Sequence, residues 1–333
     1  MDDALLVGEG RLFTNPDPDL LRAHQARKSR GLVPKVTTVA EAVARYVPEG
    51  AYVAVGGFGQ TRIPTALLHE IVRQGRRHLG LSGHTATHDF QILTAGRCFD
   101  RCDVAYIVGL EMRGLSPAAR RYCESGEVEL CEWTNAALLW RYRAAAMGVS
   151  FLPSRSMLGT DTFRYSAARQ IRCPFTGGRY AALPALSPDV TLVHVHRADV
   201  YGNCQIDGST VADLEAAAAA RHVVVTCERL INNREIRSHP ERTFLPWYLV
   251  DAVIEVPFGC YPGNMPGEYF SDEEHLAEWL EVEKDPATFE SFVDRNIRKT
   301  RDFQEYLDLR GGMERLIRLR HEELLIDREG EDE

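Results

Sequence analysis

The chain has 333 residues, 44% hydrophobic and 26% charged, with 39 basic and 48 acidic side chains and a net charge of −9. This composition provides a sizeable apolar core and excludes a disordered chain, and the negative charge disfavours nucleic acid as a partner. The sequence contains no apolar run of the roughly 20 residues that cross a bilayer, its start is acidic where a signal peptide is basic, and its eight cysteines form no CxxC pair. We therefore expect a cytoplasmic protein that binds neither membranes nor nucleic acid.

Residues 1–35 have weak hydrophobic periodicity and two prolines, so we expect an N-terminal arm outside the core that lies on a partner. The first helix is predicted to begin at Thr38, because Thr38 and Glu41 are spaced as a capping box. Pro48 to Gly50 end it, and residues 51–55 follow as a nearly continuous apolar run. Such a run is typical of a strand buried on both faces of a parallel sheet.

The same helix and strand unit recurs along the chain. A second helix is predicted after Pro64 and ends at Gly75. Further strands are expected at 78–82, 104–108, 128–133, 190–196, 222–227 and 252–256, with helices between them that include 136–147 and 211–220. This alternation predicts an α/β fold, an open and mainly parallel sheet with helices on both faces. We assign residues 36–333 to one domain with C-terminal helices from about 271.

A glycine-rich loop, Gly56-Gly57-Phe58-Gly59, directly follows the first predicted strand. Glycines here allow a ligand to approach the backbone, and open amides near a helix start favour an anionic or carbonyl oxygen. The pattern is not a dinucleotide fingerprint, because Arg62 stands where the last glycine of GxGxxG belongs. A ligand loop and a simple tight turn both fit this segment.

Two other segments have a functional and a structural interpretation. Gly202 and Asn203 follow the strand predicted at 190–196, where they could contact a substrate or form a hairpin turn. Two histidine pairs, His84 with His88 and His194 with His196, could in principle bind a metal. No metal-binding motif supports them, so we expect no metal and assign these histidines to core or loop hydrogen bonds.

Three glutamates lie at or near predicted strand ends, where a carboxylate could act as a nucleophile in acyl transfer. They are Glu111, Glu132 and Glu228. Each also has a structural interpretation, which for Glu228 is pairing with Arg229. We expect none of them to be catalytic.

Together these segments resemble the class I CoA-transferase family, from about Val36 to the C-terminal helices. The stretches that carry the resemblance are 55–58 with Arg62 and Pro64, 151–153, 225–228, 235–237, 250–253, and 257–259 with Pro262. The resemblance implies a fold of the type shared by CoA-transferases and sugar-phosphate isomerases. It also implies that the chain is the A (alpha) subunit of an enzyme that transfers CoA between an acyl-CoA and a carboxylic acid, with CoA as substrate and no permanent cofactor.

In that family a glutamate of a related B (beta) subunit forms the glutamyl-CoA thioester, within a Ser-Glu-Asn-Gly or Gly-Glu-Asn-Gly element. Neither element occurs here, so the resemblance implies no nucleophile in this chain and an αβ, (αβ)2 or larger assembly. Asn135 stands where a related hydrolase has Glu, and an amide cannot act as a base. His84-Thr85 and Cys260-Tyr261 differ from the residues that family members acting on glutaconate have at these positions. The resemblance therefore does not identify glutaconate as the substrate.

The residues that we expect to bind substrate are Gly56, Gly57, Phe58, Gly59, Arg62, Ser82, Gly83, Asn135, Gly202 and Asn203. Of these, Arg62 is expected to hold a substrate carboxylate with both prongs of its guanidinium. An acyl-CoA decarboxylase or hydrolase subunit on the same scaffold is the alternative function. The second alternative is a non-catalytic effector-binding module, because this broad fold has that role in bacterial regulators. Such regulators carry a helix-turn-helix, and the sequence shows none.

Overall fold

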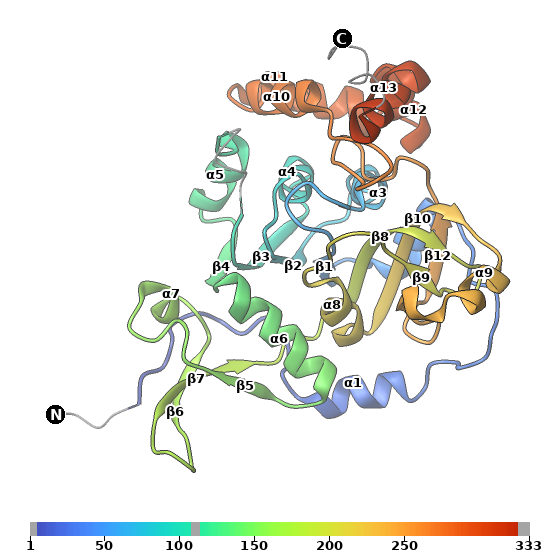
Figure 1. Cartoon of the computed structure of the whole chain (residues 1–333). Coiled ribbons are helices and arrows are strands. Elements are labelled where there is room, and N and C mark those ends of the chain that lie inside the picture. Colours follow the sequence, from blue (N-terminus) through green and yellow to red (C-terminus); the bar gives the residue numbers. More distant parts are fainter. Residues whose placement is uncertain (1–4, 108–113, 326–333) are drawn as a thin grey trace, which may run out of the picture.

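The computed structural model describes residues 5–107 and 114–325. Seven of its strands run parallel and form the centre of the main sheet (Figure 1). Their order is β12 (Ala252–Glu255), β10 (His222–Leu230), β8 (Val190–Ala198), β1 (Tyr52–Val55), β2 (Leu79–Gly83), β3 (Phe99–Val104) and β4 (Glu129–Glu132). Two short strands, β9 (Cys204–Gln205) and β11 (Thr243–Leu245), extend the sheet in antiparallel fashion from β8. The expected open, mainly parallel sheet is confirmed.

Both faces of the main sheet are covered because its central strands are apolar on both sides. In β1, Val53 and Val55 pack into one core cluster, whereas Tyr52 and Ala54 pack into another. The first face carries α2 (Val39–Tyr46), α3 (Thr65–Arg73), α4 (His88–Ala95) and α5 (Pro117–Glu124), and the opposite face carries α6 (Asn135–Met147) and α8 (Asp213–Ala219). The capping box predicted at Thr38 and Glu41 is present at the start of α2.

One strand prediction was wrong. The apolar run at 104–108 suggested a strand, but β3 spans Phe99–Val104, and residues 105–107 belong to the loop that follows it. The true strand contains three charged residues, and one of them, Asp103, is fully buried because Arg141 and other donors surround it. A search for apolar runs cannot find a strand whose central charge is neutralised by a distant partner.

A second, smaller sheet lies beside the C-terminal end of α6. It is antiparallel, with the order β5 (Phe151–Ser154), β7 (Arg179–Pro184) and β6 (Arg169–Arg172), and the short helix α7 (Asp161–Arg164) precedes β6. The hairpin between β6 and β7 leaves Phe175 94% exposed. The sequence analysis did not predict this sheet.

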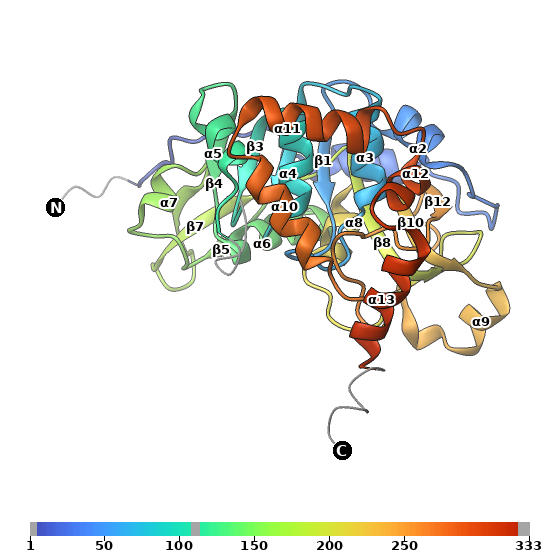
Figure 2. The same cartoon turned by 90° about the horizontal axis from the view of Figure 1, so that it is seen from above.

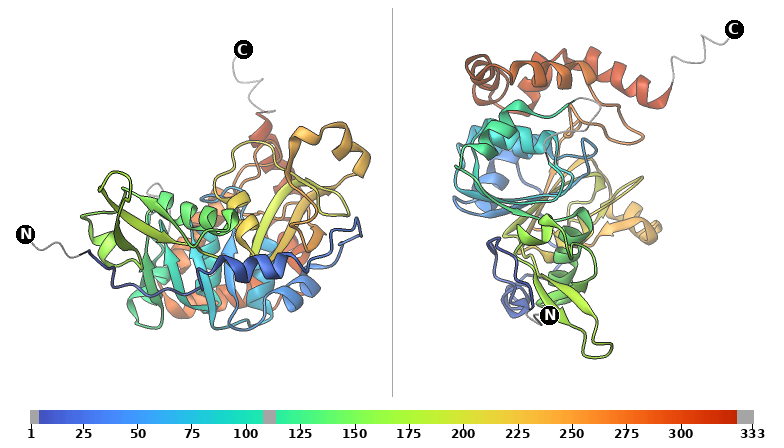
Figure 3. Two further views of the ribbon diagram at one scale, coloured as in Figure 1. Left: turned by 90° about the horizontal axis from the view of Figure 1, so that it is seen from below. Right: turned by 90° about the vertical axis from the view of Figure 1, so that its left-hand side faces the viewer.

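The N-terminal arm lies along its own chain (Figure 3). The amide of Gly8 donates to Ala168 O, α1 (Pro18–Gln25) buries Leu21, and the Lys28 ammonium contacts Asp251 at 2.7 Å. Val36 then pairs with Val253 beside β12. The arm therefore connects the small sheet to the far edge of the main sheet, and the division of the chain at residue 35 stays a prediction.

The C-terminal helices form a further layer over α3 and α4 (Figure 2). They are α10 (Glu273–Val282), α11 (Pro286–Val293), the π-helical turn η2 (Asp294–Arg298), α12 (Phe303–Leu309) and α13 (Gly312–Leu324). Trp279, Phe292 and Tyr306 are buried in this layer. Between β10 and β11 the chain forms α9 (Asn233–Ser238) and η1 (Pro240–Arg242). None of the described helices has the length and apolar composition needed to span a membrane.

Candidate functional site

The strand order reverses between β1 and β8, since the chain proceeds from β1 to β2, β3 and β4 on one side and from β8 to β10 and β12 on the other. In open parallel sheets ligands bind at the carboxyl edge of such a switch point. The glycine loop follows β1 at this edge. Gly59 N donates to Thr85 O at 3.0 Å and Arg62 N donates to Asn264 O at 3.0 Å, so the loops after β1, β2 and β12 meet here.

The glycine loop adopts a conformation that requires glycine. Gly57 has φ +90°, and a Cβ there would lie 2.6 Å from Thr61 O. At Gly56 a Cβ would lie 2.8 Å from an Asp213 oxygen, whereas at Gly59 it would meet nothing within 4 Å. Phe58, between them, is 42% exposed. The loop therefore presents the Phe58 ring outward, whereas Gly59 beside it is buried.

The amides of this loop are not open, which corrects one expectation. Gly56 N donates to Leu192 O at 2.8 Å, Gly57 N to Asp213 Oδ1 at 2.7 Å, Phe58 N to Thr61 O at 2.9 Å and Gly59 N to Thr85 O. With all four donors used within the chain, the loop cannot bind an oxyanion through them. The glycine loop therefore contributes to the candidate site through the shape of its surface, which forms one wall of that site.

Arg62 also differs from its expected role. Its side chain has no exposed surface, and its guanidinium binds both oxygens of Asp213 at 3.0 Å and donates to Ser209 O at 2.9 Å. Burial alone would raise the pKa of Asp213, but the Arg62 charge and hydrogen bonds hold that pKa below its usual range. Because a carboxylate of the same chain already occupies the guanidinium, direct binding of a substrate carboxylate does not fit this geometry. Arg62 instead fastens the glycine loop to α8.

Ser82 and Gly83 lie inside the sheet rather than on a surface. The Ser82 hydroxyl is 1% exposed and contacts both Tyr142 OH and Val53 O. Gly83 ends β2, where a Cβ would lie 2.8 Å from the Ile107 side chain. These contacts explain both residues structurally, and binding of substrate by either stays a prediction.

Gly202 and Asn203 form the turn of the β8–β9 hairpin, which was the structural alternative. Gly202 has φ +99°, and the Asn203 amide group donates to Asp199 Oδ2 at 2.8 Å while its oxygen accepts from Trp247 N at 3.2 Å. Both ends of the Asn203 side chain are therefore engaged within the protein, and nothing here supports contact with a substrate.

A polar group at the start of α6 fits a ligand site better. Among the described residues, His84 Nδ1, Thr85 Oγ1 and Asn135 Oδ1 are buried without a hydrogen-bond partner. Burial lowers the pKa of His84, whereas a hydrogen bond to the Asn135 backbone raises it, so the imidazole is neutral at pH 7 and lies beside Asn135. Unpartnered buried polar atoms are uncommon in native proteins, although the described residues contain others, such as both ring nitrogens of His69 where α3 packs on α12. Two neighbouring loop ends with such atoms indicate a place where a bound molecule supplies the missing partners.

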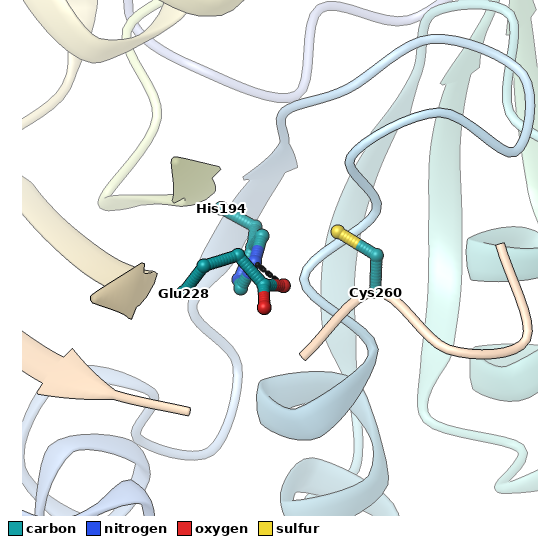
Figure 4. A group of neighbouring side chains, drawn as sticks. All are labelled: His194, Glu228 and Cys260. Atoms are coloured by element: carbon teal, nitrogen blue, oxygen red, sulfur yellow. Dashed lines mark hydrogen bonds and ion pairs between the residues drawn. The ribbon is translucent and has the colours of Figure 1, made fainter. Parts of the chain in front are cut away.

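The histidines considered as metal ligands have separate environments. His88 packs on Trp279, and His196 bonds to Pro266 O and to Asp207 N. His194 lies beside Glu228 and Cys260, with the possible ligand atoms of these three within 4.8 Å of one another (Figure 4). The Glu228 oxygens already accept three protein hydrogen bonds, which account for this cluster without an ion. The absence of a metal stays a prediction.

The three glutamates have different outcomes. The structural interpretation paired Glu228 with Arg229, but this was wrong. Arg229 instead contacts Glu268, with its Nη2 atom 3.4 Å from Glu268 Oε1. Glu132 is half-buried at the end of β4, and Glu111 lies outside the described residues. The sequence analysis missed Asp213 and Asn264, which both contact the glycine loop. Each of them is separated from this loop by more than half the length of the main domain, so no local sequence signal identifies them.

A cavity of about 660 Å³ lies elsewhere, between α1 and the small sheet, and is lined mainly by apolar groups that include Phe151, Ile171 and Tyr180. It adjoins Gly148, just beyond the C-terminal end of α6, whereas Asn135 begins that helix. A helix of this length spans about 20 Å, so the cavity is separate from the carboxyl edge.

The comparisons with known proteins agree with this fold. The family described as coenzyme A transferase matches residues 36–256. The A subunit of glutaconate CoA-transferase from Acidaminococcus fermentans is 30% identical over 303 residues, which cover 86% of this chain and 94% of that one, and the crystal structure of that enzyme superposes with a TM-score of 0.82 over 86% and 95% of the two chains. The A subunit of 3-oxoadipate CoA-transferase from Pseudomonas knackmussii is 33% identical over 276 residues, 82% and 96% of the chains.

A crystal structure of the decarboxylase AibA/AibB is 32% identical, with a TM-score of 0.71 over 79% of this chain and all of that one. The open parallel sheet and the loop at its switch point thus define a member of the coenzyme A transferase family, to which this chain belongs. Since A subunits match it over most of their length, the chain is a CoA-transferase subunit of the A type.

Proposed function

We propose that this chain works with a related B subunit to move CoA between an acyl-CoA and a small carboxylic acid, through a glutamyl-CoA thioester on the partner. The observation that carries this proposal is the state of the carboxylates around the glycine loop. Asp213 is held by Arg62, and Glu228 accepts three hydrogen bonds. Neither described carboxylate is free to attack a thioester.

The reaction then divides between two chains. The partner's glutamate attacks the acyl-CoA carbonyl and expels the CoA thiolate, which leaves an acyl-glutamyl anhydride. The thiolate attacks the glutamyl carbonyl and releases the first acid, so that the glutamate carries CoA as a thioester. The same steps in reverse, with a second carboxylate, regenerate the glutamate and a new acyl-CoA. CoA is therefore a substrate, and no permanently bound cofactor is needed.

This chain supplies the opposite wall of the site. The exposed Phe58 ring covers the acyl group, excludes water from it and helps to position it. The unpartnered atoms of His84, Thr85 and Asn135 hydrogen-bond polar groups of the acid or acyl chain. Gly56, Gly57 and Arg62 hold this wall in place without contacting substrate. We place the assembly in the cytoplasm, as an αβ unit that associates further.

Trapping the intermediate tests the proposal. The co-purified two-chain complex is incubated with acyl-CoA and no acceptor acid, then treated with borohydride or hydroxylamine and analysed by mass spectrometry. We expect the label on a glutamate of the partner. Label on this chain would overturn the division of roles, and product without label on either chain would favour the decarboxylase or hydrolase alternative.

Size-exclusion chromatography with light scattering tests the pairing itself. A chain whose site lacks a nucleophile should turn over acyl-CoA only in complex with its B subunit. A well-behaved monomer that turns over acyl-CoA alone would contradict the proposal.

A further inference from the structure

A buried polar network under the loop after β12 is not used by the proposed chemistry. Glu228, on β10, is 4% exposed, and His194, on β8, is fully buried. His194 contacts Thr226 Oγ1 through Nδ1 and Glu228 Oε1 through Nε2, both at 2.8 Å (Figure 4). One tautomer satisfies both contacts, because Nε2–H donates to the carboxylate while Nδ1 accepts from the threonine hydroxyl.

The other donors to Glu228 come from the loop 256–269. Phe258 N donates to Glu228 Oε2 at 2.7 Å, and the Tyr269 hydroxyl donates to Oε1 at 2.7 Å. The same hydroxyl accepts from Cys260 N at 3.1 Å. Glu228 thus holds the loop near both of its ends, directly through Phe258 and Tyr269 and indirectly through Cys260.

The loop 256–269 in turn holds the glycine loop. Asn264 O accepts from Arg62 N at 3.0 Å, and Asn264 N donates to Gln60 O at 3.1 Å. The Thr61 hydroxyl donates to Asn264 Oδ1 at 2.8 Å, and a Cβ on Gly263 would lie 2.1 Å from Gln60 O. The two loops are therefore in direct backbone contact, and a shift of one displaces the other.

We propose that Glu228 is a positioning residue, which fixes the glycine loop at the carboxyl edge by anchoring the loop 256–269 to β10. The proposal rests on the proposed function only where it predicts activity, since the mechanical coupling of the two loops exists whatever the substrate is. Glu228 acts through Phe258, Tyr269 and Asn264 and does not touch substrate.

The physical reason lies in the cost of leaving buried polar groups unsatisfied. Glu228→Gln keeps the size of the side chain but cannot accept from all three donors, because its NH2 faces a hydrogen-bond donor at one of the two oxygen positions. The amide of Phe258 or the hydroxyl of Tyr269 then loses its acceptor, and the loop moves to recover one. A displacement of about 1 Å at a site can cost roughly 100-fold in rate.

A matched control exists in the same chain. Glu283, in the C-terminal layer, is fully buried and accepts from Ser116 Oγ at 2.6 Å, Trp279 Nε1 at 2.8 Å and Gln91 Nε2 at 3.1 Å. Glu283→Gln disturbs a carboxylate of the same type that has no contact with either loop. The two variants therefore separate loss of position from general loss of stability.

The experiment compares hydrogen–deuterium exchange and kinetics of the two-chain complex in the wild type, Glu228→Gln and Glu283→Gln. For Glu228→Gln we expect at least about tenfold faster exchange in peptides covering 56–62 and 257–265, and a kcat lower by about tenfold or more with little change in KM. Glu283→Gln should change neither peptide. Tyr269→Phe removes one of the three donors to Glu228 and the acceptor of Cys260 N. Because the bond from Phe258 N to Glu228 remains, this variant should give an intermediate effect, and it replaces Glu228→Gln if that variant does not fold.

The outcomes are distinguishable. Unchanged exchange at 56–62 in Glu228→Gln and Tyr269→Phe, or equal effects in Glu283→Gln, would overturn the positioning role. Faster local exchange with unchanged activity would support the positioning role and contradict the proposed function of the glycine loop.

Discussion

The Arg141–Asp103 pair beside the sheet and the Arg62–Asp213 pair at its carboxyl edge are chemically alike but serve different regions. All four side chains have no exposed surface. Asp103 also accepts from Trp133 Nε1 and Tyr52 OH, and the Arg141 guanidinium stacks 4.0 Å over Trp133. Tyr52 and Asp103 belong to strands, Arg141 belongs to α6 and Trp133 directly follows β4, whereas Asp213 binds a loop arginine and a loop amide.

The difference shows that the role of a buried ion pair depends on whether its two side chains belong to helices and strands or to a loop. A pair between regular elements holds the fold together, and a pair between a helix and a loop fixes the shape of a site. Both pairs bear the cost of desolvation. Variants that break one pair at a time separate the two roles.

Removing Asp103 should cause the largest loss of stability. Asp103→Ala leaves the Arg141 charge buried without its partner, and we expect the free energy of unfolding to fall by about 3–5 kcal/mol. Denaturant unfolding followed by tryptophan fluorescence measures this. The control is Asp100→Ala on the same strand, whose partly exposed pair with Arg101 should be worth less than about 1 kcal/mol. Equal effects of the two variants would show that the buried cluster does not hold α6 to the sheet.

Arg62→Lys should affect both the site and the fold. Lysine keeps the charge but cannot bind both oxygens of Asp213 and Ser209 O together, so we expect a loss of roughly 1.5–3 kcal/mol in stability. Because the glycine loop loses its fastening to α8, the kcat/KM of the complex should fall by up to about 100-fold. Steady-state kinetics and thermal unfolding of the same sample check both. A variant with normal stability and a higher KM for the acid alone would restore Arg62 as a direct ligand.

Asp89, near the start of α4, is a buried carboxyl group that accepts hydrogen bonds from backbone amides, and it should make the stability of the chain depend on pH. Burial raises the pKa of Asp89 to about 7, against the lowering effect of amides that include Thr87 N, which donates to it at 2.7 Å. Between about pH 4 and 7 the folded chain thus holds a proton that the unfolded chain has lost. The contribution of Asp89 to stability therefore falls as the pH rises through this window and is constant above it.

Asp89→Asn removes this dependence. We expect the variant to exceed the wild type in stability by about 1 kcal/mol at pH 8, because its new amide group lacks a partner and offsets part of the gain. At pH 4 the difference should reverse, because the wild-type carboxyl group is then protonated in the folded chain and its burial no longer carries the cost of a charge. Unfolding curves at pH 4, 6 and 8 measure it, and a difference that does not change with pH would contradict the protonated state of Asp89.

The sequence was sufficient for the parallel sheet and for the position of the glycine loop at its carboxyl edge, and insufficient for the contacts around that loop. Apolar runs located β1, β2, β8, β10 and β12, because strands buried on both faces have continuous hydrophobic patterns. They failed at β3, where Asp103 is buried by Arg141 from a helix 38 residues later. They also failed at the short strands β5, β6 and β7, of which β6 and β7 carry exposed arginines.

The glycine loop was located correctly, but its chemistry was not. Arg62 lies 151 residues from Asp213 in sequence, and no local pattern shows that the guanidinium is already occupied. The same holds for three of the four loop amides, whose acceptors Leu192 O, Asp213 Oδ1 and Thr85 O come from other segments of the chain. Resemblance to a family locates a loop, whereas which of its groups remain available is decided by tertiary contacts.

His84→Asn should give the smallest change in stability of these variants, and it should change kcat/KM for one class of acceptor acid more than for another. Its Nδ1 has no partner among the described residues, so His84→Asn forfeits no hydrogen bond of that atom in the folded chain. If the neutral imidazole bonds a polar group of the acid, the ratio of kcat/KM for a dicarboxylic and a monocarboxylic acceptor of equal length should change about two- to tenfold, equivalent to ~0.5–1.5 kcal/mol. His78→Ala, an exposed histidine after α3, is the control and should leave the ratio unchanged. An equal loss for both acceptors in His84→Asn would show that His84 only shapes the loop, because a residue that hydrogen-bonds one substrate must discriminate between acids that do and do not carry its partner.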